Sequence, residues 1–251
     1  MCDQCDGFSR REVLKGVLAG LGAMALGACG PEVPHNELPD VYHDHLADEF
    51  GPASAAPVRI DPGRIVVPPP VPAQASDYGS IMPRSAWTRS PLQLPNGNPM
   101  DGVTKVTIHH SGDGKPFLGE TVADVARHLQ IVEQAHLQRG MIDIAYHFAV
   151  DRAGRAWQLR WLQYEGQHVR IGKNGVRNNE HNVGVVVLGD FNLQPVAAAQ
   201  RDRLFELVKL ILRKYPQARG AVHMHGELVE TDCPGKSLKA AILDGRRRGL
   251  V

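Results

Sequence analysis

Cysteine is scarce in this sequence. Only four cysteines occur among 251 residues, and three of them, Cys2, Cys5 and Cys29, fall within the first 29 residues. Cys233 is therefore the single cysteine in the remainder, where no disulfide framework can form. Cys2 and Cys5 have Cys-x-x-Cys spacing, but no βαβ pattern surrounds them, so we do not interpret them as redox or zinc residues.

Long hydrophobic runs and a strong charge of one sign are also missing. The apolar stretch 16–28 spans only about 13 residues, which is too short to cross a bilayer comfortably. The formal net charge of +1 points to no particular partner by itself, and we expect no nucleic-acid partner. A hydrophobic content of 43% with 22% charged residues is typical of a globular chain, and the length suits one domain with appendages.

The charges are unevenly distributed along the chain. Residues 31–77 carry eight acidic and two basic residues, whereas residues 78–251 carry 23 Lys and Arg against 16 Asp and Glu. A basic domain on an acidic linker would suit an anionic polymer such as cell wall. A modest basic excess is equally consistent with a role in solubility alone.

The first 29 residues have the pattern of a targeting signal. Residues 9–15 contain Arg10-Arg11 in a twin-arginine export pattern, and the apolar stretch 16–28 follows. The signal ends in Leu26-Gly27-Ala28-Cys29, which resembles a lipobox, so Cys29 would carry lipid and become the new N-terminus. We expect export by the twin-arginine route and a lipid anchor in the membrane of the cell envelope, in the periplasm or on the outer surface. The alternatives are an uncleaved signal anchor and a plain cleaved signal.

Residues 30–79 have the composition of a linker. Proline is dense, with Pro68-Pro69-Pro70 and Pro72, and hydrophobic periodicity is absent. Such a stretch favours extended polyproline conformations and could reach on the order of 100 Å from the membrane. We therefore expect the folded domain to occupy residues 80–251.

Three residues far apart in this domain offer ligands for a metal ion. His109 ends the β-branched, alternating run 105–108, which predicts a buried strand. His225 and Cys233 lie eight residues apart in a loop. Two imidazoles and one thiolate suit Zn²⁺, and three protein ligands leave the fourth tetrahedral position for water, as in catalytic sites. A structural zinc site would need a fourth protein ligand, and no Cys-x-x-Cys lies nearby.

Four blocks of sequence occur in a characteristic order. They are Thr107-Ile108-His109-His110-Ser111, the run from Asp143 to Phe148, the run from Asn182 to Phe191, and His225 with Cys233-Pro234-Gly235. Together they resemble the zinc amidase family that joins the peptidoglycan recognition proteins and the T7-lysozyme-type N-acetylmuramoyl-L-alanine amidases. The resemblance covers roughly residues 80–251. It also extends to the segment 81–87, in which Trp87 would be a packing residue.

Hydrophobic periodicity predicts an α/β domain. The expected strands are 103–109, 144–150, 156–159, 183–188 and 221–222, and the expected helices are 122–136, 195–211 and 237–247. Thr121 and Asp124 form a capping-box pattern before the first helix. The apolar run 183–188 is typical of a central strand buried on both faces. We expect a mixed central β-sheet flanked by helices, similar to a peptidoglycan recognition protein, with both metal-binding arms at one edge.

The resemblance implies roles for further residues near the metal. Tyr146 occupies the position where the amidases carry a tyrosine, whose hydroxyl would donate to the oxyanion or orient the water; the alternative is a buried strand tyrosine with a satisfied hydroxyl. Thr231 aligns with a site that is lysine in phage-type amidases and threonine in many recognition-protein amidases, and it would donate a neutral hydrogen bond. Val186 replaces the catalytic glutamate of a cytosolic sub-branch, which leaves the general base open.

Several other polar residues fall near these blocks. His168, in an element that resembles the family's Gly-Ala-His, is a candidate for substrate contact, and His223, which alternates with His225, is a second candidate. Glu227 is either a partner of a metal ligand or a simple loop carboxylate. Packing roles are expected for His110 and His147, and surface or satisfied core positions for His128 and His136.

The resemblance implies a peptidoglycan hydrolase. It would cleave the amide between N-acetylmuramic acid and L-alanine of the stem peptide by zinc-activated water. The alternative is a module that binds peptidoglycan without cutting it. Non-catalytic members of the family commonly lack the cysteine ligand, so the presence of Cys233 with Tyr146 favours the enzyme. Peptidoglycan or muropeptides are the expected partners of a monomeric chain, while the substrate form and the diamino acid stay open.

Overall fold

The computed structural model describes residues 61–65, 74–90, 97–172 and 175–251. The predicted signal with Cys29 and most of the predicted linker lie outside these ranges. No helix within them is long and apolar enough to cross a membrane.

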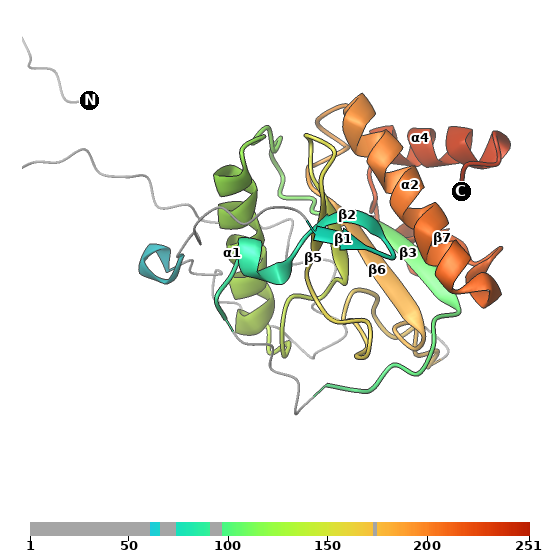
Figure 1. Ribbon diagram of the computed structural model, residues 1–251, viewed down its shortest axis with the longest axis horizontal. Helices are drawn as coiled ribbons and strands as arrows, with labels where there is room; N and C mark the ends of the chain where they lie inside the picture. The colour runs from blue at the N-terminus through green and yellow to red at the C-terminus, as the bar shows by residue number, and fades with distance from the viewer. Residues whose placement is uncertain (1–60, 66–73, 91–96, 173–174) are drawn as a thin grey trace, which may run out of the picture. The chain divides into compact units, whose positions relative to one another are not determined.

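A seven-stranded mixed sheet forms the centre of the described residues (Figure 1). Its strands are β1 (Gln74–Ser76), β2 (Gly79–Met82), β3 (Lys105–His110), β4 (Phe148–Val150), β5 (Ala156–Gln158), β6 (Asn182–Val187) and β7 (Val222–Met224). They lie in the order β1-β2-β5-β4-β6-β3-β7. Strand β3 runs parallel to its neighbours β6 and β7, whereas β1–β2 and β4–β5 are antiparallel hairpins. The predicted mixed sheet is therefore confirmed.

Helices cover both faces of this sheet. Helix α1 (Val122–Gln138) lies on one face, and α2 (Ala198–Lys214) and α4 (Lys236–Arg247) lie on the other (Figure 1). The four-residue helix α3 (His225–Leu228) follows β7 directly, and 3₁₀ turns occupy Pro62–Arg64, Arg84–Ala86 and Pro216–Ala218. The predicted arrangement of a sheet between helices is confirmed.

Strand β6 shows why the sheet has a core on each face. All of its residues are buried, and its side chains alternate between the two sides. Val183, Val185 and Val187 pack with α2 and α4, whereas Val186 packs with α1. Continuous burial explains the nearly unbroken apolar sequence, as expected for a parallel strand covered by helices.

The start of the folded domain is also fixed by buried polar contacts. Arg84 is buried and pairs with Glu133 of α1 at 2.9 Å and with Asp143 at 3.1 Å. Trp87 is fully buried, and its Nε1–H donates to the carbonyl of Gln158 at 2.8 Å. The placement of Trp87 agrees with its predicted packing role. The predicted capping box is confirmed as well, because Thr121 and Asp124 exchange both of its hydrogen bonds.

Several predicted boundaries are wrong. Strand β1 lies inside the predicted linker, so the sheet begins before residue 80. The backbone N–H of Asp61, also inside that linker, donates to the side chain of Gln134 in α1 at 3.0 Å. Strand β4 begins at Phe148 and not at residue 144, which leaves Tyr146 in the segment before it. Helix α2 begins at Ala198 and not at Pro195, since the N–H of Val196 instead bonds the Ser237 hydroxyl at 3.0 Å.

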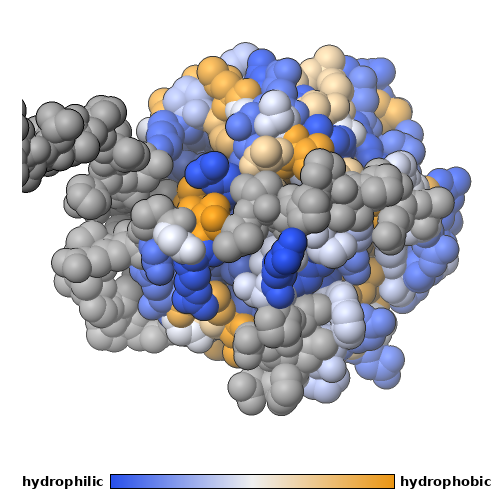
Figure 2. Space-filling model, turned by 60° about the vertical axis from the view of Figure 1, so that its left-hand side comes forward, coloured by the Kyte–Doolittle hydropathy of each residue, from blue (hydrophilic) through white to orange (hydrophobic). Residues whose placement is uncertain are grey.

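The surface carries apolar residues in small groups. Figure 2 shows one face of the molecule, on which hydrophobic residues are scattered among hydrophilic ones. Among the described residues the exposed large hydrophobic side chains are Leu118, Trp161, Ile171, Val176, Leu193 and Leu243. Single exposed apolar residues are normal on proteins. Two of them, Ile171 and Val176, line a cavity described below.

Candidate metal centre

Parallel strands bring three potential ligands together at one end of the sheet. His109 is the penultimate residue of β3, and His225 is the first residue after the neighbouring strand β7. Cys233 lies in the loop between α3 and α4. All three side chains are buried, and their ligand atoms lie within 4.8 Å of one another. Among the described residues this is the cluster of His, Cys, Asp and Glu that could hold a metal ion.

The spacing of the ligand atoms fits a tetrahedral zinc ion. Zn–S and Zn–N bonds of about 2.3 and 2.0 Å at a tetrahedral angle place sulfur and nitrogen about 3.5 Å apart. The Sγ of Cys233 lies 3.7 Å from the Nδ1 of His109. The His109 and His225 rings are tilted by 56° to each other, with centroids 4.5 Å apart. The donor set and its spacing therefore suit one ion bound by two imidazoles and one thiolate.

Burial keeps the thiol of Cys233 protonated without a metal. Burial raises its pKa to about 12, although the backbone N–H of His110, which donates to Sγ at 3.4 Å, acts in the opposite direction. A metal ion must bind the thiolate, so metal binding at neutral pH would release the thiol proton. A buried thiol whose sulfur accepts a backbone N–H is suited to losing its proton when a metal binds.

The loop that carries Cys233 is closed by its own hydrogen bonds. The N–H of Gly226 donates to the carbonyl of Cys233 at 3.0 Å, and the N–H of Cys233 donates to the Thr231 hydroxyl at 3.2 Å. A Cβ on Gly226 would lie 2.9 Å from the carbonyl oxygen of Thr231, so a side chain there would push the loop apart. Thr231 thus helps to hold Cys233 in place.

Glu227 fixes the start of the helix that carries His225. Its carboxylate accepts the N–H of Met224 at 2.7 Å and pairs with Arg246 of α4 at 2.6 and 2.8 Å. The hydrogen bond from Arg246 lowers the pKa of this carboxyl, which therefore stays ionised. The sequence offered two interpretations of Glu227, a partner of a metal ligand or a simple loop carboxylate. Its placement favours the first.

Tyr146 lies beside the cluster. Its ring centroid is 5.2 Å from that of His109 and 5.6 Å from that of His136, and the side chain is partly exposed. Burial raises the pKa of its hydroxyl, and the neighbouring Cys233 adds to the rise. The hydroxyl therefore stays protonated at neutral pH and can act as a hydrogen-bond donor.

The remaining histidines take different places. His110 accepts the N–H of Phe191 at 3.4 Å, and His147 accepts the N–H of Gly184 at 3.0 Å, which agrees with the packing roles predicted for both. His128 is buried, with its Nε2 3.2 Å from the carboxylate of Asp113, but that nitrogen makes no hydrogen bond, so the position is in the core without being fully satisfied. His223 is half-buried on the edge strand β7, and it is not part of the ligand cluster within the described residues.

His168 does not have the placement expected of a substrate contact. Only 2% of it is exposed, and its Nδ1 lies 3.0 Å from the Nε2 of His109. A group so deeply buried beneath a ligand has little surface to offer to a substrate. The sequence contained a signal only for a close approach to strand β6, because Gly184 interrupts a buried run of valines, and the His168 ring lies where its side chain would be.

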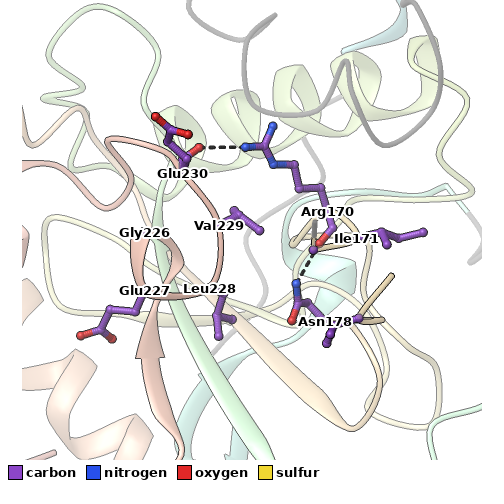
Figure 3. A pocket seen from close by; sticks show the side chains of 10 residues that line it. Arg170, Ile171, Asn178, Gly226, Glu227, Leu228, Val229 and Glu230 are labelled. Atoms are coloured by element: carbon purple, nitrogen blue, oxygen red, sulfur yellow. Dashed lines mark hydrogen bonds between the residues drawn. The ribbon is translucent and has the colours of Figure 1, made fainter. Parts of the chain in front are cut away.

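A cavity of about 620 Å³ borders the ligand loop (Figure 3). It lies between the segment Gly226–Glu230 and the segment that contains Arg170 and Asn178. Figure 3 shows the Arg170 side chain reaching towards Glu230, whose carbonyl oxygen accepts its hydrogen bond at 3.1 Å. The lining combines aliphatic side chains with charged ones, and the residues are Arg170, Ile171, Gly172, Val176, Asn178, Gly226, Glu227, Leu228, Val229 and Glu230.

Comparison with known proteins agrees with the fold and the order of these residues. The profile of the family described as N-acetylmuramoyl-L-alanine amidase matches residues 97–236, which is more than half of the chain and includes all three ligands of the cluster. The chain belongs to this amidase family.

Individual relatives of the chain include recognition proteins and an amidase. It is 27% identical over 162 residues to a peptidoglycan-recognition protein of Drosophila simulans, covering 64% of this chain and 84% of that protein. It is 29% identical over 170 residues to the N-acetylmuramoyl-L-alanine amidase of Sus scrofa, covering 63% of this chain and 26% of that protein. The solved structure of peptidoglycan recognition protein-LE with tracheal cytotoxin has a TM-score of 0.57 at 23% identity, covering 65% and 92% of the two chains. The likeness to that structure confirms the expected fold.

Proposed function

We propose that this member of the amidase family is a zinc-dependent peptidoglycan hydrolase that cleaves the amide between N-acetylmuramic acid and L-alanine of the stem peptide. The observation that carries the proposal is the buried cluster of His109, His225 and Cys233, whose spacing suits a tetrahedral zinc ion with one open position. The family match and the amidase relative support the same chemistry. Peptidoglycan or a muropeptide is the proposed substrate.

We assign different roles to the residues around the metal. Bound zinc would polarise the scissile carbonyl and lower the pKa of a water molecule towards about 7. To the protonated hydroxyl of Tyr146, whose ring centroid lies 5.2 Å from that of His109, we assign a hydrogen bond to the developing oxyanion. We keep the Thr231 hydroxyl, which accepts the N–H of Cys233 at 3.2 Å, as a second candidate for a neutral hydrogen bond to the substrate.

The chain does not use the base of the cytosolic sub-branch. Val186 pairs in register with His109 across the β3–β6 ladder, so a glutamate at this position would stand beside the ligand. Val186 is instead buried in the core on the α1 side. An aliphatic side chain cannot accept a proton, and the proposal therefore assigns no residue to that role.

The cavity beside the ligand loop gives room for part of a large substrate. A muropeptide extends in two directions from the scissile amide, with sugar on one side and peptide on the other. The cavity shares the segment Gly226–Glu230 with the loop that joins the two ligands (Figure 3). We place one of the two arms of the substrate there.

Recognition without cleavage is the second candidate function. The similarity to the Drosophila simulans peptidoglycan-recognition protein favours it. The ligand cluster favours the enzyme, because binding alone needs neither a buried thiol nor a tyrosine donor beside it.

Digestion of muropeptides distinguishes the two candidates. We expect the zinc-loaded protein to release intact stem peptide with a free L-alanine amino group, as detected by mass spectrometry. Protein treated with a chelator serves as the control and should release none. Measurable binding of muropeptides by the zinc-loaded protein with no peptide release would instead support recognition.

We further propose that the chain is exported and lipid-anchored through Cys29. The support is the sequence pattern of the twin-arginine pair and the lipobox, which lie outside the described residues. Replacement of Cys29 by alanine should abolish labelling of the chain by a fatty-acid probe in living cells. Unchanged labelling of the Cys29→Ala chain would rule out the anchor.

A further inference from the structure

The tautomer of His109 can be read from a chain of three groups. The Nε2 of His168 lies 3.1 Å from the carbonyl oxygen of Asn182, and a carbonyl only accepts, so this nitrogen carries a proton. The ring is buried, and its described hydrogen-bond partners are this carbonyl and the His109 ring, so no anion there offsets a charge; the site favours the neutral ring, whose Nδ1 is an acceptor. The Nε2 of His109, 3.0 Å from that Nδ1, is then the donor.

This chain of hydrogen bonds leaves one nitrogen of His109 for a metal. With the proton on Nε2, the Nδ1 of the neutral ring has a lone pair, and this nitrogen is the one that lies 3.7 Å from the Sγ of Cys233. The opposite tautomer would put a proton on Nδ1, where it would block coordination. We propose that His168 is a positioning residue that fixes the tautomer and orientation of His109 and so presents Nδ1 to the metal.

The protein builds a close-fitting site for the His168 ring. A Cβ on Gly184 would lie 2.5 Å from the ring and a Cβ on Gly166 only 2.4 Å from it, so both positions need glycine for the ring to fit. The backbone N–H of His168 donates to the side chain of Asn179 at 3.0 Å. The ring of His147 packs against it edge-on, with centroids 5.9 Å apart. The ring is therefore held by the fold and does not depend on a bound metal for its position.

The choice of histidine as the partner has a physical reason. Metal-bound histidines usually donate their second ring N–H to a carboxylate, a carbonyl or water. A carboxylate here would be buried, with a large desolvation cost, whereas a neutral imidazole accepts one hydrogen bond and passes the chain on to the backbone of β6. His168 thus orients the His109 ring without adding a buried charge next to the thiolate of Cys233.

The test compares two variants of His168 with a matched control. His168→Leu removes the acceptor, whereas His168→Gln keeps an acceptor oxygen. His128→Leu is the control, because His128 is also a buried histidine, 3.2 Å from Asp113, but has no role in the proposed chain to His109. Thermal unfolding of the three variants measures the general cost of losing a buried histidine.

Two readouts are expected to separate positioning from stability. In competition with a chelator, His168→Leu should bind zinc between about tenfold and a hundredfold more weakly than the parent, while His168→Gln loses less and the folded His128→Leu protein binds as tightly as the parent. In the metal-free parent, nitrogen-15 NMR of the histidine rings should show His109 with its proton on Nε2, and His168→Leu should lose this preference.

Parent-like zinc affinity in a folded His168→Leu protein, or a proton on the Nδ1 of His109 in the metal-free parent, would overturn the inference. The inference rests on the proposed zinc site, but the two can fail separately. If the parent binds no zinc, the proposed function fails, and the NMR spectrum still reports whether His168 sets the tautomer.

Discussion

A Cys233→Ser protein should bind zinc more than about a hundredfold more weakly than the parent, since loss of a direct ligand should exceed the tenfold to hundredfold cost of losing an outer partner. The serine hydroxyl is far less acidic than a thiol and does not supply the negative charge that the metal draws from Cys233. Hydrolysis should fall with the zinc content. Metal analysis of the purified protein, together with competition against a chelator, measures the effect.

The histidine ligands and one neighbour provide the controls for this prediction. His109→Ala and His225→Ala should lower zinc content as Cys233→Ser does. His223→Ala should not, because His223 lies on strand β7 outside the ligand cluster. Full zinc occupancy in the His225→Ala protein would show that the metal is held elsewhere.

A Tyr146→Phe protein should keep its fold and its zinc but turn over about a hundredfold more slowly, the usual cost of removing one oxyanion donor. Only the hydroxyl is lost, and the ring can still pack against His109 and His136. The KM should change little, because the hydrogen bond is strongest in the transition state. Steady-state kinetics on a soluble muropeptide, with zinc content measured in parallel, gives both values.

Tyr215→Phe is the matched control for the loss of one phenolic oxygen. The hydroxyl of Tyr215 lies 3.5 Å from that of Tyr78, at the C-terminal end of α2, and the residue packs against the core on the face of the sheet opposite α1. Its kcat should equal that of the parent. An unchanged kcat in Tyr146→Phe would mean that Tyr146 only packs and that another donor, such as Thr231, stabilises the oxyanion.

Local sequence patterns predicted two of the strands around the site. The β-branched run before His109 forms β3, and the apolar run that begins at Val183 forms β6, because each is short and buried by its neighbours. Parallel pairing of β3 with β7 then brings His109 and His225 to the same end of the sheet. The donor set could be proposed from the sequence because His109 follows a recognisable strand pattern and His225 and Cys233 lie only eight residues apart.

Features that depend on contacts across the fold could not be predicted. Helix α3 has four residues, too few to give a periodic pattern, and it is held by Glu227 and Arg246. The contact between His168 and His109 joins residues 59 positions apart, and nothing local to His168 distinguishes a buried partner of a ligand from a substrate contact. The start of the sheet at Gln74 could not be predicted, because this segment becomes a strand by pairing with β2 and not through its own composition.

Hydrolysis in heavy-oxygen water (H₂¹⁸O) tests the central claim most directly. The zinc-loaded protein is incubated with an N-acetylmuramoyl peptide, and the products are analysed by mass spectrometry. Cleavage of the proposed amide predicts one heavy oxygen in the lactyl carboxyl group of N-acetylmuramic acid and none in the peptide, which carries a free L-alanine amino group. Label at a sugar hydroxyl or a peptide carboxyl, or binding of the substrate with no labelled product, would contradict the assignment.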